Sequence, residues 1–453
     1  MNRKHVWFFA FLLFTFIASA DERITLTMDE AVERALNQSI NLRRSALDLA
    51  QAGYSAGRLW SELFPSFSLS AGLGFLPSTT LFTEPGFNFN SDALSYTLNF
   101  GISFSLNPSF SASMRRIELA YRSQLLSHEN ASRQLEIHVV RNFLTLITLQ
   151  ANISLMEENL ELATATMESD RVAWVNGLIS ELSWLNSQLS VQTARYNLNN
   201  AQGVYKNALG EFLALLGMHP DTLIIFDGTV GIVPLVLDPE RLIFEHLPRR
   251  PDIISQRQTI ERLELTEAVT THSSRSPTLN LSTQWRGGPL PNDGLAAQFT
   301  DNISGSLTVN IPIDSWISGT RQSQTIRAAG NEVEKARLDL QNMETQARTQ
   351  IRTLVTRLEN TWGSLEIARM RVDVARLTAE AAEVGFVNGT VEFRELEDRR
   401  NALSEAILRL LQGELTYQSL LLDLAAALNM DWRTLIEQLE SEDYANQVLG
   451  GIQ

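Results

Sequence analysis

The pattern of apolar residues divides the chain into long segments with a helical period and short segments with a period of two. All 13 prolines lie between Pro65 and Pro312, and none lies between Pro108 and Pro220. Residues 109–219 and 313–453 are therefore free of the residue that breaks helices most strongly. Both segments are rich in Leu, Ala, Glu, Gln and Arg, which favour helix. The sequence predicts long helices in each.

A heptad spacing indicates that these helices pack against partner helices. In the first segment, spacings of three and four alternate along Leu146, Leu149, Ile153, Met156, Leu160, Ala163 and Met167. The second segment repeats this less regularly, at Ile351, Leu354, Leu358 and Leu365. Such spacing keeps an apolar stripe on one side of a helix, as in coiled coils.

One Asn-Gly pair interrupts each helical segment. The pairs are Asn176-Gly177 and Asn388-Gly389, and both residue types tolerate the left-handed backbone that ends a helix. We therefore predict two antiparallel helical hairpins, at about 109–218 and 315–436. The first helix of each hairpin would run about 65 residues, or about 100 Å.

Four segments alternate apolar and small polar residues, in pairs at about 65–107 and 277–313. From Leu94 to Leu106 every second residue is Leu, Tyr, Phe or Ile, and the others are Ser, Thr, Asn or Gly. Strands of a membrane β-barrel alternate in this way. A half-buried soluble sheet alternates too, but its strands are usually shorter. Four strands cannot close a barrel, and unpaired edges cannot face lipid, so a membrane sheet here requires several chains.

The chain is internally duplicated. Residues Val172 to Met218 align without a gap on Val384 to Met430, at an offset of 212 that also relates Pro65 to Pro277. We expect a first structural repeat at 21–218, a linker at 219–240, a second repeat at 241–440 and a C-terminal tail at 441–453. Each repeat would contain a helix, a strand pair and a long helical hairpin.

Composition and the N-terminus indicate an exported protein. Arg3 and Lys4, an apolar run and Ala18-Ser19-Ala20 predict a signal peptide at 1–20. The alternative, an uncleaved anchor, is disfavoured because the apolar run is short for a bilayer. No cysteine is present, which removes disulfides and thiolate metal sites. The net charge of -15 disfavours binding to nucleic acid.

Several motifs occur in an order and at a spacing that resemble the TolC-like outer-membrane efflux protein family. They are Leu26-Thr27-Met28-Asp29-Glu30-Ala31 with Ala35-Leu36, Trp174-Val175-Asn176-Gly177, Arg249-Arg250-Pro251-Asp252-Ile253, Ile311-Pro312-Ile313-Asp314 with Gly319, and Phe386-Val387-Asn388-Gly389. The resemblance implies a mainly α protein with a membrane β-barrel. In this family a homotrimer shares one twelve-stranded barrel, set in outer-membrane lipid, and a periplasmic α-helical tunnel. The partners implied are a periplasmic adaptor (membrane fusion protein) and an inner-membrane pump of the RND, ABC or MFS type.

The resemblance also implies two functional sites. Two acidic residues of the family's aperture match Glu395 and Asp398, with Glu392 beside them. The alternative is a solvated helix face neutralised by Arg394, Arg399 and Arg400. The tips that contact the adaptor match Asn176, Gly177 and Leu178 in the first repeat, and Asn388, Gly389 and Thr390 in the second. The tyrosine and arginine that latch the closed tip of TolC fall on Phe386 and Val391, which cannot form the same bonds.

Other functions fit the sequence less well. The six histidines are scattered, and the chain has no His-x-x-x-His pair, phosphate-binding Gly loop or Gly-x-Ser-x-Gly elbow. We therefore expect no catalytic site, no metal site and no cofactor. An exported coiled-coil scaffold or adhesin without a pore would explain the heptads, but not the duplicated strand pairs. The transported substrate, the particular pump and the adaptor are not encoded in a recognisable motif.

Overall fold

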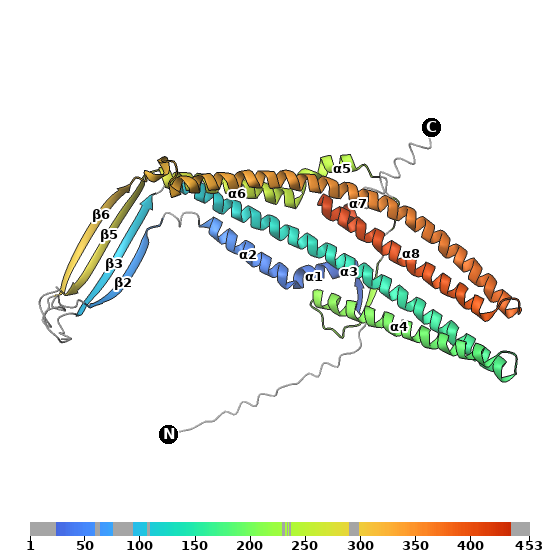
Figure 1. The fold of residues 1–453 in the computed structure, drawn as a ribbon. Helices are drawn as coiled ribbons and strands as arrows, with labels where there is room; N and C mark the ends of the chain where they lie inside the picture. The colour runs from blue at the N-terminus through green and yellow to red at the C-terminus, as the bar shows by residue number, and fades with distance from the viewer. Residues whose placement is uncertain are drawn as a thin grey trace, which may run out of the picture.

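The computed structural model describes residues 24–58, 64–75, 94–106, 109–228, 232, 234, 237–289 and 299–435. The signal peptide and the C-terminal tail expected from the sequence lie outside these residues. The molecule is a long rod with a four-stranded sheet at one end and two helical hairpins at the other (Figure 1).

Two hairpins of long helices form the helical part. The first consists of α3 (Phe110–Val175) and α4 (Glu181–Leu215), and the second of α7 (Arg321–Val387) and α8 (Phe393–Leu428). The four helices lie side by side in the order α4–α3–α8–α7 (Figure 1). Ile351, Leu354, Leu358 and Leu365 are buried, and every member of the first predicted stripe is buried or half-buried. The predicted hairpins and their apolar stripes are confirmed.

Shorter helices fill the end of this layer nearest the sheet. They are α2 (Ile40–Gly57) and α6 (Pro251–Arg275), and the layer there runs α2–α3–α6–α7 (Figure 1). The N-terminal helix α1 (Met28–Gln38) begins with a capping box. The Thr27 hydroxyl accepts a hydrogen bond from the Glu30 N–H (3.3 Å), and the Glu30 carboxylate accepts one from the Thr27 N–H (3.0 Å). The first motif of the sequence is thus a helix start.

The four predicted strands form one antiparallel sheet in the order β2–β3–β5–β6 (Figure 1). They are β2 (Ser66–Phe75), β3 (Leu94–Leu106), β5 (Thr278–Pro289) and β6 (Phe299–Asn310). Pairing of β3 with β5 joins the two repeats. One face is apolar and exposed, with Phe67, Leu69, Leu73, Leu98, Phe100, Leu281, Ile303, Leu307 and Val309. The other face carries polar side chains, most of them small.

A second, two-stranded sheet was not predicted from the sequence. Strand β1 (Ile24–Thr27) pairs in parallel with β4 (Ile224–Asp227), which lies in the segment expected to be a linker. Each strand has four residues, too few to show a period, and their partners are far apart in the sequence. Residues of this sheet join a core around Phe143, Phe212 and Phe226, whose ring centroids lie 5.2–6.4 Å apart.

A second core lies where α7 and α8 meet the short helices α5 (Pro239–His246) and η3 (Leu247–Arg249). It contains Tyr417, whose ring lies 5.7 Å from that of Trp362. The remaining short helix, η5 (Asp314–Trp316), precedes α7. Each repeat therefore has a core near the middle of the rod, and these cores fix the long helices from which the tips extend.

Candidate functional site

The two hairpin tips have the same backbone. At the end of α3, the Leu178 N–H donates to the Ala173 carbonyl (2.8 Å) and the Gly177 N–H donates to the Trp174 carbonyl (2.9 Å). At the end of α7, Thr390 donates to Gly385 (2.8 Å) and Gly389 to Phe386 (3.0 Å). Both sets of bonds are Schellman motifs, which satisfy the last carbonyls of a helix.

Glycine is favoured at both tips by the backbone conformation rather than by crowding. Gly177 and Gly389 have φ of +73° and +74°, where most side chains would be strained. A Cβ added to either would meet no atom within 4 Å. Apolar side chains next to these glycines are strongly exposed: Val175 at 68%, Leu178 at 77% and Val387 at 79%. Both tips therefore present an open surface with a bare backbone turn and an apolar rim.

Different side chains brace the two tips. In the first, Trp174 stacks on Trp184 of α4 at 4.4 Å, with an angle of 5° between the rings. In the second, Phe386 meets Phe393 at 6.1 Å and 59°. Gly385 lies so close to Val391 that an added Cβ would come within 2.5 Å of its Cγ2 atom. Phe386 and Val391, the positions of the TolC latch, thus take part in apolar packing within one hairpin.

The acidic residues after the second tip face different ways. Glu392 is the residue before α8, and Glu392, Glu395 and Asp398 are exposed around a shallow surface hollow that Arg394 and Arg399 also line. Arg399 lies 3.4 Å from Glu395 and partly compensates its charge. Among the described residues, Asp398 has no hydrogen-bonding or ionic partner. Glu395 and Asp398 are one turn apart, so the carboxylates of both lie on one side of α8.

Arg400 and Glu397 lie on the other side of α8 and join the two hairpins. The Arg400 guanidinium donates to the Thr166 hydroxyl of α3 (3.1 Å) and the Glu383 carboxylate of α7 (2.9 Å), and lies 3.8 Å from Glu397. The Ser190 hydroxyl of α4 donates to Glu397 (2.8 Å). The Arg400 side chain is only 18% exposed. One network therefore connects all four helices near the tips.

This network is not evident from the sequence, in which Arg400 is one of three arginines that could neutralise an acidic helix face. A periodic pattern shows which residues share a face of α8, but it does not show which helix lies against that face. The spacing of Glu397, Arg400 and Ser404 along α8 was the available indication, since Ser404 also contacts α3, through Asn159 at 2.9 Å.

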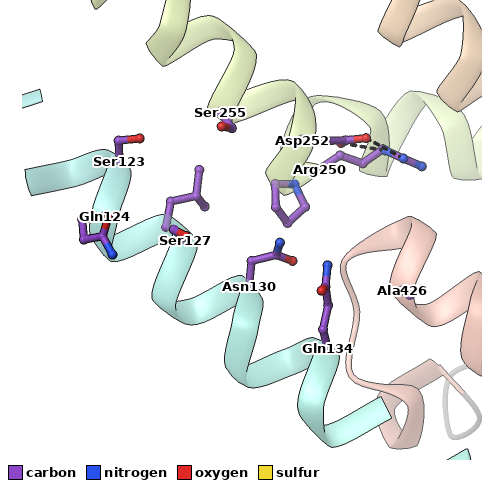
Figure 2. A pocket seen from close by; sticks show the side chains of 11 residues that line it. Ser123, Gln124, Ser127, Asn130, Gln134, Arg250, Asp252, Ser255 and Ala426 are labelled. Atoms are coloured by element: carbon purple, nitrogen blue, oxygen red, sulfur yellow. Dashed lines mark hydrogen bonds and ion pairs between the residues drawn. The ribbon is translucent and has the colours of Figure 1, made fainter. Parts of the chain in front are cut away.

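A polar hollow separates the two repeats nearer the sheet. Ser123, Gln124, Ser127, Asn130 and Gln134 of α3 line one side of it, and Asp252 and Ser255 of α6 line the other (Figure 2). At its edge, Arg250 is buried and donates to Asp252 (2.7 Å), to Gln350 of α7 (3.1 Å) and to the Ala427 carbonyl of α8 (3.1 Å).

Arg250 therefore anchors the start of α6 to two long helices. Burial alone would raise the pKa of the Asp252 carboxyl, but hydrogen bonds and charge from Arg250 and the Ile253 N–H lower it below its usual value. The Arg-Pro-Asp motif of the sequence thus has a structural role, because Arg250 and Asp252 pair with each other and Arg250 also binds the long helices.

The described residues contain no group of three or more His, Cys, Asp or Glu arranged to hold a metal ion. One described helix, α3, is long and apolar enough to cross a membrane by length and composition alone. A helix that packs in a core passes the same test, and Val139, Val140, Phe143 and Leu144 of α3 belong to the core shared with α1, α4 and β4.

Comparison with solved structures gives the same architecture. The Campylobacter jejuni CmeC outer membrane channel matches with a TM-score of 0.69 at 17% identity, covering 91% of this chain and 88% of that one. The outer membrane protein VceC of Vibrio cholerae matches with a TM-score of 0.68 at 17% identity, covering 89% of this chain and 96% of that one. At these identities the likeness shows the fold.

Sequence comparison names the family. A curated relative, "Toxin and drug export protein A" of Aggregatibacter actinomycetemcomitans, is 24% identical over 333 residues, which are 72% of this chain and 69% of the relative. The family model for outer membrane efflux proteins matches residues 31–218 and 242–430, once in each repeat. These two matches confirm the duplication and the resemblance seen in the sequence. The chain belongs to the outer membrane efflux protein family, and its location is the outer membrane with a helical tunnel in the periplasm.

Proposed function

We propose that three copies of this chain close into one passive efflux conduit, whose acidic aperture lies at the second hairpin tip. Members of this family are outer-membrane channels that work as homotrimers with an adaptor and an inner-membrane pump, and the family is not a class of enzymes.

The main support for the proposal is that exposed apolar stripes lie on the helices at the edges of the layer. On α7, exposed large apolar residues recur at spacings of three, four and seven: Ile367, Met370, Val374, Leu377 and Val384. On α4 they occur at Leu182, Leu185, Leu189 and Tyr196, and on α2 at Ile40, Leu47 and Tyr54. Helices α6 and α8, inside the layer, carry none among the described residues.

The stripes lie on the edges of the layer and face away from it. Leu365 and Val372 of α7 are buried, and the exposed stripe is offset from them by two residues, or about 200° at 3.6 residues per turn. A helix that is apolar on opposite sides requires a partner on each side. Helices α4 and α7 are the two ends of the described layer, so α7 of one copy would pack on α4 of the next.

The sheet supports the same arrangement. Its described edge strands are β2 and β6, at the same two ends as the helical edges (Figure 1). In lipid, edge strands must be paired. Pairing β6 of one copy with β2 of the next extends the contact that joins α7 to α4. An interface between unlike surfaces closes into a ring when the rotation per copy fits.

In such a ring, Glu395 and Asp398 would gather near the axis at the narrow end. Three copies of two carboxylates would attract cations and repel anions. The Arg400 network supports the closed form, since it fixes the α7–α8 hairpin against α3 and α4 without the tyrosine and arginine of TolC. The tips at Asn176-Gly177-Leu178 and Asn388-Gly389-Thr390 are proposed as the adaptor surface, because both present a bare backbone turn with an apolar rim.

The cargo follows the inner-membrane partner, which we propose to be a pump of the RND, ABC or MFS type. The name of the curated relative mentions toxins and drugs, so both small molecules and proteins are candidate cargo. A pore-free coiled-coil scaffold is disfavoured by the alternating sheet, which a scaffold does not require.

Cysteine cross-linking tests the ring, because the chain has no native cysteine. Leu189 lies twelve residues after the first tip glycine and Leu377 twelve residues before the second, so each lies at a similar distance from its own tip. We expect Leu189→Cys with Leu377→Cys to oxidise into covalent dimers and trimers and no larger species on denaturing gels. In the control, Ala379→Cys replaces Leu377→Cys; this buried position faces away from the stripe and should not cross-link. Monomers only, or an unlimited ladder, would contradict the closed trimer.

A further inference from the structure

The polar face of the four-stranded sheet carries one charged side chain among its described residues, Arg286 on β5. The register places Arg286 opposite Asn99 on β3 and Asn302 on β6. The other side chains described on this face belong to Ser, Thr, Asn and Gln, and the remaining positions are Gly. Arg286 is exposed on this face.

Neutral groups position the guanidinium. Its Nε donates to the Asn99 Oδ1 (3.1 Å), which also accepts from Gln284 (3.4 Å), while the Asn99 amide donates to the Ser70 hydroxyl (3.4 Å). Asn99 is therefore a positioning residue that links three strands. The Nη groups of Arg286 have no partner among the described residues, so four of its five donors are available.

No described carboxylate compensates this charge. The nearest acidic residue in the sheet register, Asp301, pairs with Gly287 and so belongs to the opposite face. There its carboxylate accepts a hydrogen bond from the Trp285 indole (3.4 Å). The side chains around Arg286 are polar, whereas the opposite face is mainly apolar. A lipid-facing position also disfavours Arg more than Asp. The face that carries Arg286 is therefore the hydrated one.

Arg286 lies near the end of the sheet that is remote from the helices. Strand β5 begins at Thr278, next to α6, and at about 3.4 Å per residue Arg286 lies about 27 Å farther along the strand. At a strand tilt of about 40° this corresponds to about 20 Å of height in a barrel. The apolar band of a membrane barrel is about 25 Å tall. In the proposed conduit, Arg286 would thus lie inside the outer mouth, while Glu395 and Asp398 lie at the opposite end.

We propose that Arg286 residues from three copies form a cationic ring inside the outer mouth, which binds small polyvalent anions and the anionic groups of cargo. The proposal rests on the trimeric conduit argued above. Three guanidinium groups that share one hydrated lumen raise the local concentration of anions. The conduit then carries charge of opposite sign at its two ends, so that cations concentrate at the periplasmic aperture and anions at the outer mouth.

Thiol labelling tests the proposal in the full-length protein in intact cells, with single cysteines introduced at Asn302, on the polar face, and at Ile303, on the apolar face. The probes are two membrane-impermeant methanethiosulfonates, one with a sulfonate and one with a trimethylammonium group. We expect Asn302→Cys to react with both and Ile303→Cys with neither. Arg286→Gln should lower the ratio of anionic to cationic labelling rates at Asn302→Cys by at least about fivefold, and Arg286→Lys should restore it.

A second variant protects the test against misfolding. Asn99→Asp leaves Arg286 in place and puts a carboxylate against its guanidinium, so it should also lower the ratio. Labelling of Asn302→Cys with a ratio that neither Arg286→Gln nor Asn99→Asp changes would overturn the cationic ring and leave the conduit intact. Equal labelling of positions 302 and 303, or no labelling of either, would overturn the hydrated lumen and the proposed conduit with it.

Discussion

The two hairpin tips share a backbone but not a surface. Gly177 and Gly389 have the same φ within one degree, and the same hydrogen bonds close both turns. Around the first turn, a tryptophan stack joins the two helices. Around the second, the aromatic contact is looser and an acidic face follows.

The difference extends about two turns into each hairpin. In the first, Asp170 is buried and accepts a hydrogen bond from Ser187 of α4, which is also buried. At the offset of 212, the second hairpin has Ala382, which is buried, and Arg399, which is exposed and lies 3.4 Å from Glu395. The two repeats thus share the turn, but the first hairpin is braced internally and the second carries charged groups on its outside. We therefore expect substitutions at the first tip to lower stability and substitutions at the second tip to change permeation.

Removal of the tryptophan stack should have the largest effect on stability. Trp184→Ala leaves Trp174 without its partner, and truncation of a packed tryptophan costs about 3 kcal/mol. Amide hydrogen exchange should show lost protection at the ends of α3 and α4. The matched change in the second hairpin, Phe393→Ala, should cost less because Phe386 meets it at an angle and at a larger distance. Equal losses of protection in both hairpins would contradict the claim that the first tip is braced more strongly than the second.

Loss of the Arg400 network should have the next largest effect, which is to destabilise the closed state of the channel. Arg400→Gln removes contacts to α3 and α7, and a loss of about 1.4 kcal/mol would raise the open population about tenfold. Single-channel recordings in planar bilayers and uptake of large antibiotics by cells measure this population. Arg399→Gln is the control, since it removes the neighbouring charge, which pairs only within α8 among the described residues. An equal rise of the open population in both variants would show that the positive charge matters and that the contacts of Arg400 with α3 and α7 do not.

The hairpins, their turns and the strand faces could be predicted because their determinants are local. Proline-free segments, heptad spacing and Asn-Gly pairs act within a few residues of each other, and alternation fixes which side chains share a face. The β1–β4 pair and the Arg400 network join residues that are distant in sequence, so no local pattern reports them. The orientation of the acidic residues on α8 could not be predicted for the same reason. Their spacing on α8 was evident, but only the packing of α8 shows that Glu397 turns inward while Asp398 stays exposed.

The acidic face should determine charge selectivity with a smaller effect. We expect Glu395→Gln with Asp398→Asn to lower the preference for cations severalfold and to weaken block by multivalent cations in planar bilayers. The structure refines this expectation: Asp398→Asn alone should have more effect than Glu395→Gln alone, because Arg399 already compensates Glu395. Higher salt should reduce all of these differences, since exposed charges are screened. The control is Glu405→Gln, which removes an exposed carboxylate that pairs with Arg409 farther up α8. Unchanged selectivity in the double variant would remove the acidic aperture without affecting the fold.

Substitution of the tip glycines should have the smallest effect on stability. It tests whether the exposed surface of each turn is needed for function while the fold of the turn is kept. Asparagine tolerates a positive φ, and neither site has an atom within 4 Å of an added Cβ, so Gly177→Asn and Gly389→Asn should leave the melting temperature almost unchanged. Each variant nonetheless covers the bare turn with a side chain. If the tips are the adaptor surface, both variants should reduce efflux by cells and cross-linking to the adaptor. Gly210→Asn, on an open face of α4 far from the tip, controls for the added side chain. Full efflux with either tip variant would exclude that tip from the adaptor contact, and a difference between them would show which hairpin carries more of it.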